Sequence, residues 1–172
     1  MTIRAFEERD WLAVRAILDE VATEGETYAM RVPADDAEAR GFWLHHGDDG
    51  AVVVAEIDGT VVGSANMGPN RPAQGAHVGT ASFIVGSAAR GRGVGRALGQ
   101  HVVDWHRDQG FRGIQFNAVV ETNLPAVRLW QSLGFEIVGT VPWAFRRPDG
   151  SFVGLHVMYL DLASTAHPSV SV

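Results

Sequence analysis

The stretch Arg90-Gly91-Arg92-Gly93-Val94-Gly95-Arg96 follows an apolar run, Phe83-Ile84-Val85, and opens a segment with a helical pattern. Glycines at alternate positions let the backbone turn tightly, so that successive N–H groups can point at one external group. The helix that follows would direct its unpaired N–H groups and the positive end of its dipole at the same point. Together with the three arginines, these groups predict an anion-binding site, and a phosphate fits it.

The glycine spacing excludes two common phosphate-binding loops. A dinucleotide-binding loop would need a glycine where Arg96 stands, and a P-loop needs a Gly-Lys-Ser/Thr tripeptide that the chain lacks. The pattern that does fit is R-x-x-G-x-G, read as Arg90, Gly93 and Gly95. A second pattern follows at Asn123-Leu124-Pro125-Ala126-Val127-Arg128-Leu129-Trp130-Gln131-Ser132-Leu133-Gly134-Phe135.

In this order, the two patterns resemble the acetyl-coenzyme A (acetyl-CoA) loop and the later helix, N-x-x-A-x-x-L-Y-x-x-x-G-F, of the GCN5-related N-acetyltransferase (GNAT) superfamily. The resemblance departs at Trp130, where tyrosine is usual. It implies an α+β fold, in which helices flank a mixed, mostly antiparallel sheet whose central strands, here residues 77–85 and 113–118, splay apart. It also implies acetyl-CoA as the acyl donor, direct attack by an amine in a ternary complex, and a homodimer.

Periodicity and turn signals predict the secondary structure along the chain. The expected elements are a strand at 2–6, helices at 7–24 and 35–46, strands at 51–57, 60–67 and 77–85, a helix at 93–109, a strand at 113–118, a helix from 123 that stops at Gly134, and strands at 135–141 and 152–160. Gly25 should end the first helix, and Asp35 or Asp36 should cap the second. Residues 142–150 should separate the last two strands, and Pro148-Asp149-Gly150 within them is a turn signal. We expect one domain at 1–162 and a flexible tail at 163–172.

Composition narrows the class of protein. A chain of 172 residues with 46% hydrophobic residues suits one folded domain. Its net charge of −6 argues against non-specific binding of nucleic acid, which depends on basic residues. The sequence contains no cysteine, no basic-then-apolar leader and no apolar run of membrane-spanning length. We therefore expect a cytoplasmic protein with no membrane or nucleic-acid partner and no metal.

The resemblance implies donor-binding roles for three groups of residues. Main-chain groups of residues 83–85 would pair with the pantetheine arm, and the amides of residues 91–96 would hold the diphosphate. Asn123 would hydrogen-bond the pantetheine arm, and it could also cap its helix. Trp130 would pack against the donor or the core, because an indole is no acid near neutral pH. The expected donor-binding set is Phe83, Ile84, Val85, Arg90, Gly91, Arg92, Gly93, Val94, Gly95, Arg96, Asn123 and Trp130.

The acceptor amine is expected to bind near Thr27, Tyr28, Asn117 and Trp143. The first two lie between the first two helices, a region that lines the acceptor site in the superfamily. The segment that contains Asn117 and Asn123 also resembles fungal acetyltransferases of azetidine-2-carboxylate and related proline analogues, in which the earlier asparagine holds the substrate carboxylate. The alternative for Asn117 is an amide whose hydrogen bonds are satisfied by neighbouring backbone.

Acetyl transfer from a thioester to an amine needs a neutral amine, a polarised carbonyl and a stabilised thiolate. Asn117 and His77 are the catalytic candidates. A histidine titrates in a suitable range for a base, although one at the start of a strand is more often a surface residue. Further candidates are Glu26 and Glu121 as base, and Ser132, Thr122, Tyr28 or a water as acid. We assign no general acid.

The combined patterns predict an acetyl-CoA-dependent N-acetyltransferase that acts on a small-molecule amine, such as an amino acid or a toxic analogue. A protein acetyltransferase that modifies an N-terminus or a lysine is the alternative within the same fold. A non-catalytic sensor of coenzyme A is an alternative of a different class, because the usual tyrosine is missing at Trp130.

Overall fold

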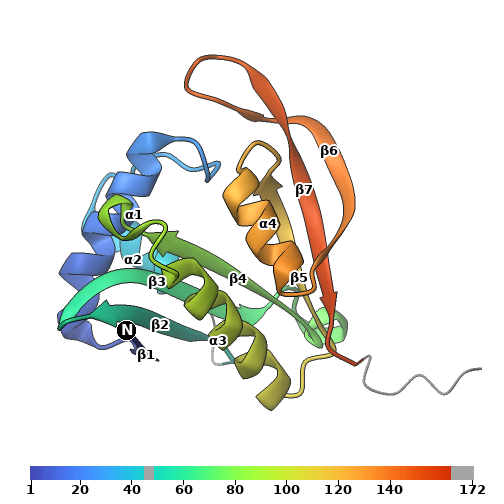
Figure 1. Cartoon of the computed structure of the whole chain (residues 1–172), viewed down its shortest axis with the longest axis horizontal. Helices are drawn as coiled ribbons and strands as arrows, with labels where there is room; N and C mark the ends of the chain where they lie inside the picture. Colours follow the sequence, from blue (N-terminus) through green and yellow to red (C-terminus); the bar gives the residue numbers. More distant parts are fainter. Residues whose placement is uncertain (45–48, 164–172) are drawn as a thin grey trace, which may run out of the picture.

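The computed structural model describes residues 1–44 and 49–163. Its elements are β1 (Thr2–Ala5), α1 (Trp11–Glu24), α2 (Asp36–Trp43), β2 (Ala51–Ile57), β3 (Thr60–Pro69), β4 (Val78–Val85), α3 (Val94–Asp108), β5 (Gly113–Val120), α4 (Leu124–Ser132), β6 (Glu136–Arg146) and β7 (Phe152–Asp161). This order confirms the predicted α+β class (Figure 1). The predicted tail, from residue 164 onward, and the predicted end of the second helix at His46 lie outside the described residues.

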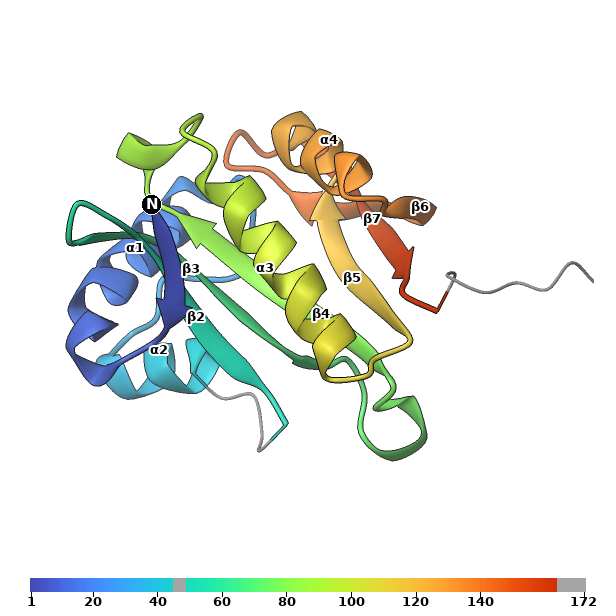
Figure 2. The ribbon, with the colours of Figure 1, turned by 60° about the horizontal axis from the view of Figure 1, so that its bottom comes forward.

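All seven strands form one sheet in the order β1-β2-β3-β4-β5-β7-β6. Neighbouring strands run antiparallel except β4 and β5, which are parallel. The β4–β5 ladder contains only two pairs, Val78 with Gly113 and Gly79 with Ile114. Beyond these pairs the two strands diverge, as Figure 2 shows. The splay that the family resemblance implied is therefore present.

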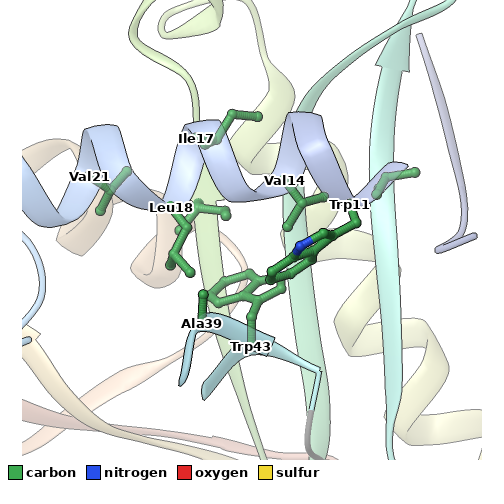
Figure 3. Packing of buried hydrophobic residues seen from close by; sticks show 9 residues of the cluster. Trp11, Val14, Ile17, Leu18, Val21, Ala39 and Trp43 are labelled. Atoms are coloured by element: carbon green, nitrogen blue, oxygen red, sulfur yellow. The ribbon is translucent and has the colours of Figure 1, made fainter. Parts of the chain in front are cut away.

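Helices α1 and α2 cover one face of the sheet. The helical period of α1 places Trp11, Val14 and Leu18 on its buried side, where they pack with Trp43 of α2 (Figure 3). The Trp43 ring nitrogen donates to the buried Ser64 hydroxyl on β3 at 3.0 Å, so this large side chain is buried with its polar atom satisfied. This packing fixes the loop between α1 and α2 relative to the central strands.

Helices α3 and α4 cover the opposite face. The buried side of α3 carries Leu98 and Val102 against β2 and β3, and α4 contributes Trp130 to a cluster with β5 and β7. On the first face, α1 and α2 lie over β2 to β4 and stop short of β7 and β6 (Figure 1). On this face, toward the loop between α1 and α2, the part of the sheet formed by β7 and β6 is therefore not covered by either helix.

Several predicted helix boundaries are confirmed. The Asp35 carboxylate accepts a hydrogen bond from the Glu38 amide at 2.8 Å and caps α2. Gly25 ends α1 in the left-handed conformation, with φ of 64°. Within residues 1–44 and 49–163, no helix combines the length and the apolar character needed to cross a lipid bilayer.

The predicted end of a strand at Val141 is wrong, whereas the turn signal at Pro148-Asp149-Gly150 is confirmed. Strand β6 continues to Arg146, and its pairing with β7 is interrupted between Val141 and Phe145 by a bulge in which Trp143 has φ of 54°. Pro142 is tolerated because β6 is an edge strand, where a missing N–H need not break a ladder. The tight turn is confined to the residues after β6, where the Arg147 amide donates to the Ser151 carbonyl at 2.9 Å.

The seam between β4 and β5 is packed against a buried histidine. His106 of α3 is fully buried, and its Nδ1 lies 2.8 Å from the Val102 carbonyl. Burial lowers the pKa of His106, and nearby backbone carbonyls only partly offset this effect. The ring fills the space in which a side chain at Gly79 would lie. Gly79 therefore permits the close approach of a side chain from α3.

Candidate donor and acceptor site

Where β5 has diverged, one side of the β4 main chain is not paired with a neighbouring strand. The Gly86 amide donates to the Val62 carbonyl of β3 at 3.0 Å, and antiparallel pairs alternate between bonded and non-bonded positions. Ile84, opposite Ser64, therefore directs its main-chain groups to β3, while Phe83 and Val85 direct theirs into the gap. The expectation that Ile84 pairs with pantetheine is wrong for this reason, whereas the main chains of Phe83 and Val85 face the gap.

Aromatic side chains close the gap on the side of α4. The ring centroids of Phe83 and Trp130 lie 4.6 Å apart, those of Phe116 and Trp130 4.9 Å, and those of Phe116 and Phe135 4.3 Å. Trp130 is only 7% exposed, so it is a core residue at the base of the gap. Its position agrees with the packing role, and its indole provides no acid there.

The loop before α3 presents unpaired backbone N–H groups. Gly91 and Gly93 both have positive φ, 74° and 81°, and a Cβ added at either would meet no atom within 4 Å. The first backbone bond of α3 runs from the Ala97 amide to the Gly93 carbonyl at 3.0 Å. Among the described residues, the amides without a backbone or side-chain acceptor in this loop are those of Gly91, Gly93, Val94, Gly95 and Arg96. These five amides, called the cradle below, are the ones available for the predicted anion site, and the Arg92 amide is not one of them, because it donates to the Ala89 carbonyl at 3.3 Å.

The three arginines of the loop are not equivalent. Arg90 donates to the Glu24 carboxylate of α1 at 2.6 Å, and this contact raises the pKa of its guanidinium. Arg96 donates to the Ser132 hydroxyl of α4 at 2.8 Å. Arg92 is exposed and has no side-chain partner within 1–44 and 49–163. Of the three predicted phosphate ligands, Arg92 is therefore the one that is free to meet an anion without breaking another contact.

Tyr28 lies on the loop between α1 and α2, and its side chain reaches into the gap beside β4. Its hydroxyl donates to the Phe83 carbonyl at 3.0 Å and accepts from the Phe83 amide at 2.8 Å. Burial raises the pKa of this phenol, so it stays neutral and can act as donor and acceptor at once. The predicted acceptor-site residue thus contacts the same main-chain groups that were expected to bind the donor.

A pocket of about 490 Å³ lies between the loop that carries Tyr28 and the far end of the β6–β7 hairpin. Its lining consists of Gly25, Tyr28, Ala29, Met30, Ala144, Phe145, Arg146, Arg147 and Pro148. The Arg147 guanidinium donates to the Glu26 carboxylate at 3.1 Å and so links the two walls. Neither Thr27 nor Trp143 lines this pocket, and Trp143 is 77% exposed. The structure therefore places Tyr28 in the pocket and leaves these two predicted residues outside it.

Asn117 lies at a β-bulge on the face of β5 opposite the aromatic cluster. Its carboxamide donates to the Asn70 side chain at 2.7 Å and accepts from Gln115 at 2.8 Å. The side chain is exposed, so the alternative of an amide satisfied by backbone is not what the structure shows. Asn123 accepts from the Ala126 amide at 3.3 Å and caps α4.

His77 is not brought to the gap. It immediately precedes β4, and its carbonyl accepts from the Arg112 amide at 2.9 Å, beside the closed end of the β4–β5 ladder. At about 3.3 Å per residue, its Cα lies about 26 Å along the strand from Val85. The structure gives His77 the surface position that was the alternative to a catalytic role.

Other candidate acids and bases are held by partners. Glu26 binds Arg147, and Glu121 accepts from the Gly154 amide at 2.5 Å. The Ser132 hydroxyl donates to the Leu129 carbonyl at 2.6 Å. Sequence reasoning missed Arg147 and Asn70, because each meets its partner across a long separation, 121 residues for Arg147 and Glu26 and 47 for Asn70 and Asn117, with no local pattern.

The geometry defines a site in which a strand with free main-chain groups leads to a cradle of amides at a helix start. A family model described as the acetyltransferase (GNAT) family matches residues 11–135. This match covers most of the chain and both sequence patterns. The chain therefore belongs to the GNAT family of acetyltransferases.

Curated relatives match over different lengths. N-acetyltransferase aca1 of Schizosaccharomyces pombe is 31% identical over 71% of this chain, and the L-amino acid N-acetyltransferase AaaT of Escherichia coli is 29% identical over 92% of it. The match spans 96% of the length of AaaT and 65% of that of aca1. Protein SPT10 of Saccharomyces cerevisiae is 31% identical over 48% of this chain, and that match spans 13% of SPT10. The chain thus spans less than two thirds of the length of two fungal relatives.

Solved structures share the fold. A GCN5-related N-acetyltransferase from Kribbella flavida is 53% identical with a TM-score of 0.89, covering 94% of this chain and 97% of that one. A ribosomal-protein-alanine N-acetyltransferase from Brucella melitensis is 32% identical with a TM-score of 0.81, covering 94% and 100%. YncA of Salmonella typhimurium, a putative acetyltransferase solved with its cofactor acetyl-CoA, is 27% identical with a TM-score of 0.80, covering 99% of each chain. GNAT neighbours are thus solved with acetyl-CoA.

Proposed function

We propose that this protein is an acetyl-CoA-dependent N-acetyltransferase that acts on the amine of a small molecule, such as an amino acid or a toxic analogue. The observation that carries the proposal is that the gap-facing part of β4 and the amide cradle follow each other along the chain. The gap-facing main chain of Phe83 and Val85 leads into residues 86–90, and the amide cradle begins directly after them at Gly91. An extended arm with a diphosphate at one end fits these two features together.

The chain's own groups can then be given roles. Acetyl-CoA, when bound, supplies an acetyl group on a thioester. Gap-facing N–H groups on β4 would polarise its carbonyl, and the cradle with Arg92 would fix the diphosphate. The aromatic cluster around Trp130 would keep water from the gap on one side. The sequence offers no cysteine as a nucleophile, in keeping with direct attack by the acceptor amine in a ternary complex.

A small acceptor is favoured by the pocket beside Tyr28. The ion pair between Arg147 and Glu26 ties its two walls together, so an extended peptide would have to break this link to lie across it. AaaT, similar to this chain over most of its length, is named for acetylation of L-amino acids. These two observations support an amino acid or an analogue as the acceptor.

The rival acceptor is a protein N-terminus, because the Brucella neighbour is a ribosomal-protein-alanine N-acetyltransferase. Thiol release from acetyl-CoA should be followed with free L-amino acids, their toxic analogues, small amines and alanine-initiated peptides. We expect turnover with free amino acids or analogues. Turnover with peptides alone would show that the acceptor is a protein N-terminus, and CoA binding without any turnover would identify a sensor.

Asn117 is proposed to hold the acceptor through its carboxamide. Asn117→Ala should raise the acceptor KM by about tenfold, the effect of losing one hydrogen bond to a charged group, with little change in kcat. Steady-state kinetics at saturating acetyl-CoA give both constants. Gln100→Ala, which removes an amide bonded to Asp104 on the outer side of α3, is the matched control. An acceptor KM equal to that of the control would remove Asn117 from the acceptor site.

The proposed homodimer would use the edge of the sheet. Strand β6 is the last strand in the sheet order, and Val138, Val141 and Trp143 on it are 69%, 53% and 77% exposed. An exposed edge strand with apolar side chains favours pairing with another copy. Sedimentation velocity should give the mass of two chains for the native protein and of one chain for Val141→Lys; one chain for the native protein would contradict the proposal.

A further inference from the structure

The Phe83 main chain already has a partner in this structure. The Tyr28 hydroxyl accepts from the Phe83 amide at 2.8 Å and donates to the Phe83 carbonyl at 3.0 Å, in the part of β4 where β5 has diverged. A backbone amide carries one hydrogen, so it can serve one acceptor of good geometry at a time. A ligand that pairs with the Phe83 amide must therefore displace the Tyr28 hydroxyl.

We propose that Tyr28 is an internal competitor of the acyl donor, and that its release on donor binding reshapes the acceptor pocket. The inference rests on the proposed function, since it takes the donor to lie along β4. In this role Tyr28 positions other groups and does not act as an acid, a base or a nucleophile. The hydroxyl occupies the gap in the free protein and leaves it when the pantetheine arm pairs with the strand.

The location of Tyr28 provides the link to the acceptor. The residue lies on the loop between α1 and α2, which forms one wall of the pocket together with Ala29 and Met30. The same loop is tied to the opposite wall through the ion pair between Glu26 and Arg147. Moving the phenol out of the gap therefore moves a wall of the acceptor pocket. Because such coupling is reciprocal, an acceptor that requires the moved loop binds better once the donor is present.

The chain provides a matched control, because it contains two tyrosines. Tyr159 on β7 has its hydroxyl beside Gly113, at the closed end of the β4–β5 ladder. Removing that hydroxyl is the same chemical change at a position away from the gap. Tyr159→Phe thus controls for the general effect of losing a phenol oxygen.

The test is calorimetric titration of the native protein, Tyr28→Phe and Tyr159→Phe with coenzyme A, with thermal unfolding measured on each. We expect Tyr28→Phe to bind coenzyme A about three- to tenfold more tightly than the native protein, because no internal hydrogen bond has to be broken. Tyr159→Phe should bind as the native protein does. Damage to the fold would weaken binding, so tighter binding is not a structural side effect.

Equal or weaker binding by Tyr28→Phe, while the native protein binds, would overturn the proposal for Tyr28 alone. No binding by any of the three proteins would overturn the proposed function instead. Should Tyr28→Phe fail to fold, the native protein labelled with 13C at tyrosine Cζ provides the answer by nuclear magnetic resonance. We expect coenzyme A to shift the Tyr28 signal and leave the Tyr159 signal in place, and an unmoved Tyr28 signal would contradict the displacement.

Discussion

Gly93→Ala is expected to weaken coenzyme A binding by at least about 100-fold. Gly93 has φ of 81°, a conformation that costs other residues about 1–2 kcal/mol, so an alanine would pull the loop out of its cradle shape. A Cβ added there meets no atom within 4 Å, so the cost lies in the backbone conformation and not in a clash. Loss of two hydrogen bonds to a charged diphosphate, each worth about 1.5–3 kcal/mol, accounts for the size of the effect. Titration calorimetry with coenzyme A measures it.

Gly110→Ala is the matched control. Gly110 follows the other end of α3, has φ of 79°, and a Cβ added there meets nothing within 4 Å. The two substitutions should therefore lower the thermal midpoint by similar amounts, while Gly110→Ala leaves coenzyme A affinity unchanged. Equal affinities for the two variants would show that the cradle does not bind the donor.

Gly79→Ala is expected to destabilise the fold by about 3 kcal/mol or more. Its Cβ would coincide with the His106 ring, which is fully buried and cannot swing into solvent. The clash must be relieved by moving α3 away from β4, next to the two pairs that hold β4 to β5. Urea unfolding at neutral pH measures the free energy of unfolding directly.

Two further variants test whether the clash with His106 causes the loss of stability in Gly79→Ala. Gly139→Ala places the same methyl group on strand β6 in open space and should change stability by less than about 1 kcal/mol. Adding His106→Ala to Gly79→Ala should recover stability relative to the sum of the single losses, because the ring that clashes is gone. Strict additivity of the two losses would mean that this contact does not explain the effect.

The features that the sequence predicted well depend on neighbours in the chain. The tight turn before α3 was readable because Gly91 and Gly93 supply the positive φ that it requires. The cap at Asp35 and the end of α1 at Gly25 were readable for the same kind of reason, since each is decided within one helical turn. The splay of β4 and β5 followed from the resemblance, and no periodicity could have shown it.

The features that the sequence did not reveal depend on contacts between distant residues. Tyr28 and Phe83 are 55 positions apart, and Arg90 and Glu24 are 66 apart. Nothing local indicates that a phenol would occupy the strand or that one loop arginine would bind α1. The end of β6 was misplaced because Pro142 normally marks a turn, and only its place at the sheet edge makes it compatible with a strand.

The central claim is that the cradle amides and the gap-facing main chain of β4 hold one ligand together. The most direct measurement is a 15N–1H correlation spectrum of the labelled protein during titration with coenzyme A. We predict that the amides of residues 91–96 except Arg92, together with those of Phe83 and Val85, shift most and saturate with one common Kd, while that of Gly110 beyond the far end of α3 stays in place. Shifts that spare the cradle, or that follow different affinities in the cradle and on β4, would contradict the claim.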